Sequence, residues 1–136
     1  MKHYLIQIKA DGTLCKVLSK ETPTLEDLQA LVGGYIEVIP TRLPRPHRPM
    51  MVINEEGKNL GLPRNEIASI IGITSGIEDV VVGDAVLVLE VGEDLRAMKP
   101  QQTSHTLFFV LSHVLEQGEG WIVAPMREDL THEREP

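Results

Sequence analysis

The sequence predicts a single α+β domain, in which about three helices pack on a mixed or antiparallel sheet of five to six strands. Three observations support this prediction. The chain has 136 residues, which is the usual length of one domain. Apolar residues make up 42% of it, which is enough to form a core. Short alternating or β-branched segments are interspersed with segments whose apolar residues recur at helical spacing.

The first two strands are expected to form a hairpin. Residues 3–9 alternate polar and apolar side chains, as a half-buried strand does. Asp11-Gly12 is a strong hairpin turn signal, and residues 13–19 return as the second strand. The alternation predicts that Cys15 is a small buried residue rather than a reactive thiol.

Three helices are expected, and capping residues define their ends. The first begins after Thr24, whose hydroxyl can cap it, and ends at Gly33, because glycine adopts the left-handed conformation without steric cost. The second carries Pro63 in its first turn and ends at about Ile71. The third covers residues 103–117, with Thr103 or Ser104 as its cap.

Patterning alone assigns the remaining segments. Further strands are expected at about 35–39, 50–54 and 79–90, with a short edge strand at 121–124. Gly83-Asp84 could introduce a bulge or a bend into the strand at 79–90. Residues 92–102 are expected to form a linker. The domain is expected to span 1–125, with a family-like core at 24–90, and the charged residues 126–136 are expected to form a flexible tail.

Charge and cysteine content limit the classes of partner. The net charge is −7, and an acidic protein repels nucleic acid unless it has a local basic patch, so no nucleic-acid partner is expected. Cys15 is the only cysteine, which fits a reducing compartment. No apolar stretch suits a signal peptide or a membrane span, so we expect a cytoplasmic protein that does not bind a membrane.

The Pro/Arg loop, defined as residues 40–49, is the first candidate for contact with a partner. Four prolines among these ten residues exclude a helix or a central strand. The side chains of Arg42, Arg45, His47 and Arg48 are therefore held on a stiff backbone. Guanidinium groups pair well with carboxylates and phosphates, so the loop could dock on an acidic protein surface, a nucleotide or a phosphate backbone. Alternatively, it is a solvated loop that balances the acidic surface of this protein.

The last helix is the second candidate. A rotation of 100° per residue places Phe108 on the apolar face and Phe109 on the opposite face, beside His113. An exposed phenylalanine there could anchor a partner or a second copy of this chain. The alternative is that Trp121 or the tail covers Phe109.

No motif for catalysis or for a cofactor is present. The sequence lacks a dinucleotide fingerprint, a phosphate-binding loop, and the CxxC and HExxH patterns of zinc sites. We therefore assign no catalytic residue, metal or cofactor. A site assembled from dispersed residues would leave no local spacing to detect, so that alternative stays open.

Four segments in order resemble a known family: residues 25–38 (LEDLQALVGGYIEV), 52–58 (VINEEGK), 61–65 (GLPRN) and 82–88 (VGDAVLV). Together they are similar to the domain of unknown function DUF3846, over about residues 24–90. The Pro/Arg loop looks expanded relative to the family pattern, and the helix from 103 onward lies beyond it. The resemblance implies a phage or mobile-element setting but no reaction, ligand or catalytic residue. If these motifs form a ligand site, Asn54, Lys58, Arg64 and Asn65 supply its polar groups.

Three functions follow as hypotheses. The first is a non-enzymatic accessory protein of phage type, which modulates a host protein of the transcription machinery or of defence through the Pro/Arg loop and the last helix. The second is a binder of a nucleotide or another small phosphorylated signal molecule, such as an oligomeric sponge, in which the loop arginines and residues 54–65 hold the phosphates. It predicts a ligand-induced rise in melting temperature. The third is an enzyme with a dispersed site, which predicts a deep pocket with perturbed titratable groups.

Overall fold

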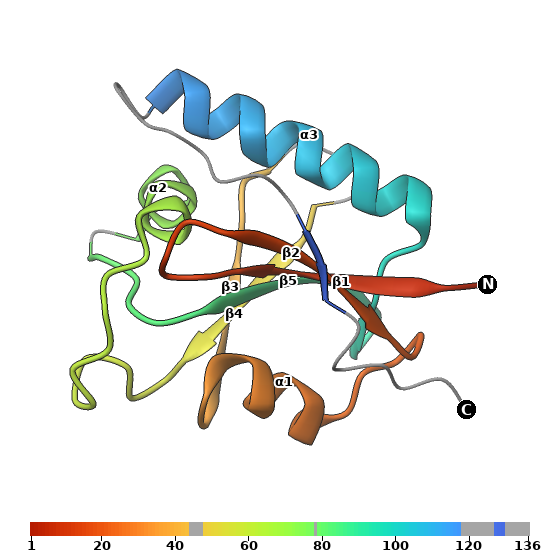
Figure 1. Cartoon of the computed structure of the whole chain (residues 1–136), viewed down its shortest axis with the longest axis horizontal. Coiled ribbons are helices and arrows are strands. Elements are labelled where there is room, and N and C mark those ends of the chain that lie inside the picture. Colours follow the sequence, from red (N-terminus) through yellow and green to blue (C-terminus); the bar gives the residue numbers. More distant parts are fainter. Residues whose placement is uncertain (44–47, 78, 118–126, 130–136) are drawn as a thin grey trace.

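The computed structural model describes residues 1–43, 48–77, 79–117 and 127–129. These residues form an α+β fold in which a sheet separates two helical layers (Figure 1). The strands are β1 (His3–Ile8), β2 (Leu14–Ser19), β3 (Ile36–Pro40), β4 (Met50–Asn54), β5 (Ala85–Val91), β6 (Asp94–Arg96) and β7 (Arg127–Asp129). The helices are α1 (Leu25–Val32), α2 (Glu66–Thr74) and α3 (Pro100–Gln117). The predicted fold class is therefore confirmed.

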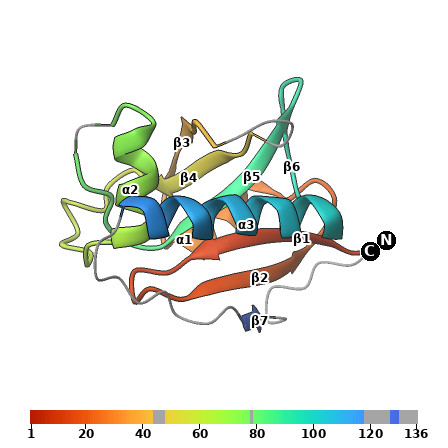
Figure 2. The ribbon, with the colours of Figure 1, turned by 90° about the horizontal axis from the view of Figure 1, so that it is seen from above.

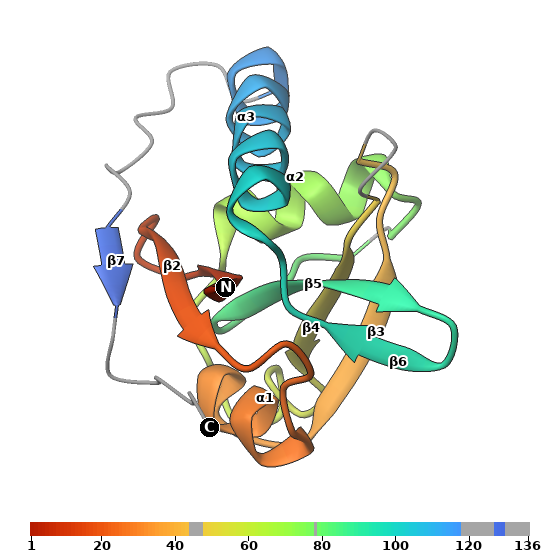
Figure 3. The ribbon, with the colours of Figure 1, turned by 90° about the vertical axis from the view of Figure 1, so that its right-hand side faces the viewer.

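The sheet has the strand order β3-β4-β5-β1-β2-β7, with β6 paired to β5. Strands β1 to β6 pair in antiparallel fashion, and β7 lies parallel to β2. Figures 2 and 3 show β7 beside β2, at the far edge from β3. Strand β5 lies between β4 and β1, so the apolar run 85–89 occupies the centre of the sheet, where it is buried on both faces.

Each face of the sheet carries its own apolar cluster. One cluster joins the sheet to α2 and α3, and includes Ile6, Met51, Leu87, Ile71 and Val110. The other joins the opposite face to α1, and includes Leu5, Val86, Leu28, Leu31 and Val32. Figure 3 shows this arrangement, with α2 and α3 above the sheet and α1 below it. None of the helices in the described part of the chain is both long and apolar enough to cross a membrane.

The predicted first hairpin and first helix are confirmed. Strands β1 and β2 pair across the Asp11-Gly12 turn, and Cys15 is fully buried. Helix α1 carries a capping box, in which Thr24 and Asp27 each accept a hydrogen bond from the other's backbone N–H. Gly33 ends the helix in the left-handed conformation, with φ 81°, and its N–H donates to the carbonyl of Gln29.

Two predicted helix starts are wrong. Helix α2 begins at Glu66 with Asn65 as its cap, so Pro63 lies before the helix rather than in its first turn. Helix α3 begins at Pro100, not at Thr103 or Ser104. Pro100 has no backbone N–H, which suits the first helical position, and the side chain of Gln102 accepts a hydrogen bond from the preceding Lys99 N–H. Both starts depend on side-chain contacts that the apolar pattern does not reveal.

The predicted strand at 79–90 and the predicted linker at 92–102 also need correction. Gly83 adopts φ 79° and interrupts the run, so β5 begins only at Ala85. Before this point the backbone bonds to the segment that leads into α2, because the N–H of Asn65 donates to the carbonyl of Val81. The proposed linker contains β6, which turns back onto β5.

The expected edge strand at 121–124 lies outside the described residues. The charged tail contributes β7, which pairs with β2 from Cys15 to Val17. This part of the tail is therefore a strand of the sheet.

Candidate functional site

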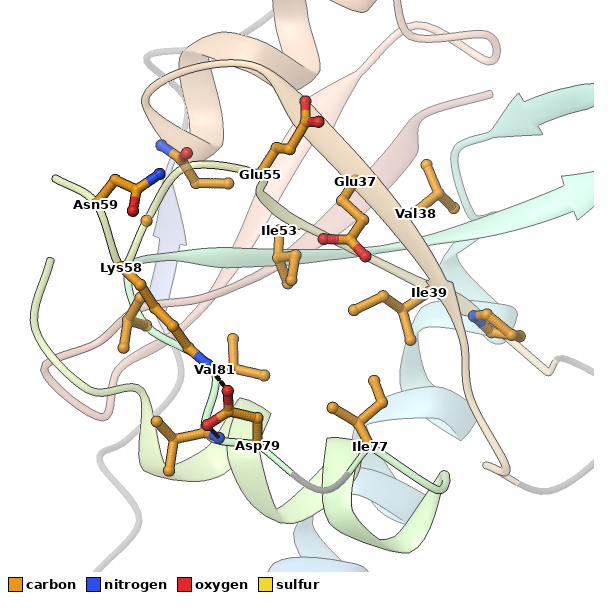
Figure 4. Close-up of a pocket in the computed structure, with 15 residues that line it drawn as sticks. Glu37, Val38, Ile39, Ile53, Glu55, Lys58, Asn59, Ile77, Asp79 and Val81 are labelled. Atoms are coloured by element: carbon orange, nitrogen blue, oxygen red, sulfur yellow. Dashed lines mark hydrogen bonds and ion pairs between the residues drawn. The ribbon is translucent and has the colours of Figure 1, made fainter.

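A groove of about 610 Å³ runs beside the edge strand β3 (Figure 4). It is called the β3 groove below. Strands β3 and β4 form one wall, and the segment that follows α2 forms the other. Its apolar lining includes Ile39, Ile53, Ile77 and Val81. Its charged lining consists of Glu37, Glu55, Lys58 and Asp79, all of which are exposed to water.

The charges of the β3 groove are predominantly negative. Lys58 forms an ion pair with Asp79 across the groove end, as the dashed line in Figure 4 marks. Within the part of the chain that the structure describes, neither Glu37 nor Glu55 has an ion-pair partner. The groove therefore carries two carboxylates without a described cation, and it suits a cationic ligand better than a phosphate.

The Pro/Arg loop is anchored at its base. Thr41, Leu43 and Pro49 are buried, and Leu43 belongs to the cluster beneath α2 and α3. The hydroxyl of Thr41 donates to the carbonyl of Pro49 at 2.6 Å, which closes the loop across its two ends. The N–H of Arg42 donates to the hydroxyl of Ser75 at 3.0 Å, which ties the loop to the end of α2.

Two of the four loop candidates can be placed. Arg42 and Arg48 are exposed, at opposite ends of the loop. No ion pair to either guanidinium is found among the described residues. Arg45 and His47 lie outside the described residues. The anchored base therefore presents at least two cations to solvent.

The two asparagines proposed as ligand groups are committed to the backbone. The amide of Asn65, which is fully buried, donates to the carbonyls of Ile8 and Gly83 and accepts from the N–H of Ala68. Asn54 donates to Val32 O at 3.2 Å and accepts from Glu56 N at 2.8 Å. These hydrogen bonds join separate segments of the fold, which fits a structural role for both residues.

The two cations of that set are each paired with a carboxylate. Lys58 pairs with Asp79, and Arg64 Nε lies 2.6 Å from Glu66 Oε1. Asn54 and Lys58 line the β3 groove, whereas Arg64 and Asn65 are not among its lining residues. The structure therefore does not bring the four predicted groups together into one phosphate cradle.

The exposed aromatic residue of α3 is Phe108, which corrects the predicted core position. Phe108 is 64% exposed, and Phe109 is half-buried with its ring 5.5 Å from that of Phe108, edge to face. The buried stripe of α3 includes Thr103, Thr106, Leu107, Val110 and Val114. Two threonines thus occupy core positions. The buried face of α3 therefore differs from the face that its apolar residues alone predict. His113 lies half-buried on the same helix.

Sequence reasoning missed the β3 groove. Its residues come from three segments that only the fold brings together. One local signal was present, because Glu37 and Ile39 alternate on a strand that ends at Pro40, and proline is found at sheet edges rather than in central strands. In the described residues, no three His, Cys, Asp or Glu side chains form a group that could hold a metal ion.

Comparison with known proteins assigns the family. The family model described as domain of unknown function DUF3846 matches residues 1–109. The chain belongs to this family. The DUF3846 match extends beyond the predicted 24–90 at both ends, and it includes residues 100–109 of α3. The helix from 103 onward is therefore not wholly outside the family region. No curated protein and no solved structure shows a significant match to the chain.

Proposed function

We propose that this DUF3846 protein is a non-enzymatic binding protein that docks on an acidic surface of a host protein through the Pro/Arg loop. The observation that carries the proposal is the anchored loop base, which holds Arg42 and Arg48 out in solvent. A loop whose ends are fixed loses little conformational entropy on binding. Arginine is well suited to this role because its planar guanidinium pairs with a carboxylate through two hydrogen bonds.

The α3 surface extends the proposed contact. Phe108 and Leu111 are exposed on this helix, and Phe109 packs against Phe108. Exposed aromatic residues often anchor protein interfaces. In the phage or mobile-element setting that the resemblance implies, the partner is a host protein of the transcription machinery or of defence, in the cytoplasm of the host cell. A second copy of this chain is the alternative partner for the same helix.

The other two hypotheses receive less support from the described residues. A phosphorylated ligand could pair with Arg42 and Arg48, but the segment 54–65 does not complete a phosphate site with them, since Lys58 and Arg64 each face a carboxylate. An enzyme needs reacting groups in a site that excludes water, whereas the charged side chains of the β3 groove are all exposed.

The test is a pull-down from host lysate with the tagged wild-type protein and with the triple variant Arg42→Glu, Arg45→Glu and Arg48→Glu. We expect a specific host protein to be captured by the wild type and lost with the variant. The matched control, in which Lys2, Lys9 and Lys20 are changed to Glu, alters the net charge equally and should retain capture. Equal capture by the wild type and the folded loop variant would refute docking through the loop.

A further inference from the structure

The outer edge of β3 presents unpaired backbone groups. Strand β3 pairs on one side with β4 and is the last strand of the sheet at this edge among the described residues. The N–H of Glu55 donates to the carbonyl of Tyr35 at 2.8 Å, which makes this a hydrogen-bonded pair. Such pairs alternate with non-bonded pairs along an antiparallel ladder. Ile36 and Val38 therefore direct their N–H and C=O groups away from β4.

Side chains on the groove side of this edge are suited to a basic strand. Glu37 and Ile39 lie on the same side of β3, because side chains alternate along a strand. Figure 4 shows both beside Ile53, facing Ile77 and Val81 across the β3 groove. A strand added to β3 would place one of its side chains opposite Glu37 and the next side chain of the same face opposite Ile39.

We propose that an extended peptide segment with a lysine or arginine two residues from an apolar residue adds to β3 as a new strand. Its backbone pairs with the N–H and C=O groups of Ile36 and Val38. Its basic side chain pairs with Glu37 and its apolar side chain packs on Ile39 in the β3 groove, while Glu55 adds negative charge at the groove rim. The site adjoins the Pro/Arg loop at Pro40, but it uses other charged side chains and selects a basic partner, whereas the loop arginines select an acidic one.

A second copy of this chain fits the edge poorly. In an antiparallel β3–β3 pair centred on Val38, Glu37 of one copy would face Ile39 of the other, and the two Glu37 carboxylates would be diagonal neighbours. Pro40 would face Ile36 of the other copy and could not donate a hydrogen bond. Two copies also repel each other through their net charge of −7 each. A basic segment removes all three difficulties.

The groove has the dimensions for such an occupant. Its volume of about 610 Å³ lies within the roughly 300–1,000 Å³ typical of ligand sites. Only alternate side chains of the added strand enter it, because the others point to the opposite face of the sheet. Specificity therefore rests on two side chains, and the backbone contributes contacts that any sequence without proline can make.

The experiment selects binders from a library of displayed random heptapeptides with the wild-type protein. We expect enriched peptides that carry lysine or arginine two positions from an apolar residue. Glu37→Lys combined with Glu55→Lys should weaken their binding at least ~10-fold, about 1.4 kcal/mol. The charge-matched control, Glu90→Lys combined with Glu93→Lys, alters exposed residues of β5 and of the β5–β6 turn and should bind as the wild type does.

Backbone pairing has its own readout. On addition of an enriched peptide, amide hydrogen exchange should slow at Ile36 and Val38 and stay unchanged at Glu37 and Ile39, whose N–H groups already pair with β4. Val38→Pro removes an N–H that β4 does not use, and it should abolish peptide binding, whereas Val38→Ala should not.

Failure to enrich basic peptides, or unchanged exchange at Ile36 and Val38, would overturn the proposal. Concentration-dependent protection without peptide would instead identify a second copy as the occupant. Loss of host-protein capture in the loop variant leaves these outcomes unaffected, so the two proposals can fail separately.

Discussion

A single amide, that of Asn65, joins three parts of the chain. It donates to the carbonyl of Ile8, 57 residues away, and to that of Gly83, 18 residues away, and it accepts from the first turn of α2. The residue is fully buried, so water cannot replace these hydrogen bonds. Asn65 thereby fixes the start of α2 against both β1 and the segment that precedes β5.

Asn65→Ala should therefore lower the free energy of unfolding by about 2–4 kcal/mol, because it removes a helix cap and two further hydrogen bonds to carbonyls in the protein interior. Asn65→Asp should also destabilise the protein, since a carboxylate retains the cap acceptor but cannot donate. Urea denaturation monitored by circular dichroism measures both effects. The exposed Asn59→Ala is the control and should change stability by less than ~0.5 kcal/mol. A comparable loss in the control, or none in Asn65→Ala, would contradict this assignment.

The partners of Asn65 explain why its role could not be predicted from the sequence. An asparagine before a helix is a recognisable cap, but the contacts with Ile8 and Gly83 exist only in the folded chain. The sequence therefore suggested a ligand group where the structure has a structural one. Thr103 and Thr106 caused the converse error. These two polar residues are buried in α3, so Phe108, which the apolar pattern places in the core, is exposed.

Among the elements, α1 was predicted best because its signals are local. Thr24 and Asp27 cap its start, and Gly33 ends it with φ 81°. No atom outside the immediate chain lies within 4 Å of the position that a Cβ at Gly33 would occupy. A substitution there consequently tests backbone strain without a steric clash.

Gly33→Ala should lower the free energy of unfolding by about 1–2 kcal/mol, which is the cost of the left-handed conformation for a residue with a Cβ. Gly33→Asn should cost less, because asparagine tolerates this conformation better. Thermal unfolding of the two variants beside the wild type gives the comparison. Equal stability of the alanine variant and the wild type would show that this helix end relaxes to another conformation.

The strands were predicted less accurately where long-range pairing decides them. The run 79–90 reads as one strand, but Gly83 and the bonding of Val81 to Asn65 divide it. Strand β6 is only three residues long and exists because it pairs with β5. The β3 groove was missed for the same reason, since Glu37 and Asp79 come to line the same groove only after the sheet and α2 have formed.

At the scale of the whole molecule, one sheet supports two separate apolar clusters. Leu31 belongs to the cluster under α1, and Ile71 belongs to the cluster under α2 and α3. Both side chains are buried, at 3% and 0% exposure. Because the same strands contribute to both clusters, loss of either should unfold the sheet and with it the other cluster.

Leu31→Ala and Ile71→Ala should each lower the free energy of unfolding by about 2–5 kcal/mol. The double variant should lose the sum of the two within ~0.5 kcal/mol, because the residues lie on opposite faces and share no cluster. Each variant should still unfold in a single transition. Urea denaturation curves followed by circular dichroism in the far and near ultraviolet test both statements, and a second transition in either single variant would show that the layers unfold independently.

The hydrogen bond from the Thr41 hydroxyl to the carbonyl of Pro49 closes the base of the Pro/Arg loop. The pairing of β3 with β4 extends to Pro40 and Met50, so this hydrogen bond lies directly beyond the last paired residues. Doubling the length of a loop costs only about 0.6 kcal/mol. Leu43 is part of the core cluster, so the positions that can be exchanged or lengthened without shifting the sheet are those between Leu43 and Arg48. The fold offers a grafting position here, where a foreign recognition sequence could be displayed on a scaffold that does not need to be redesigned.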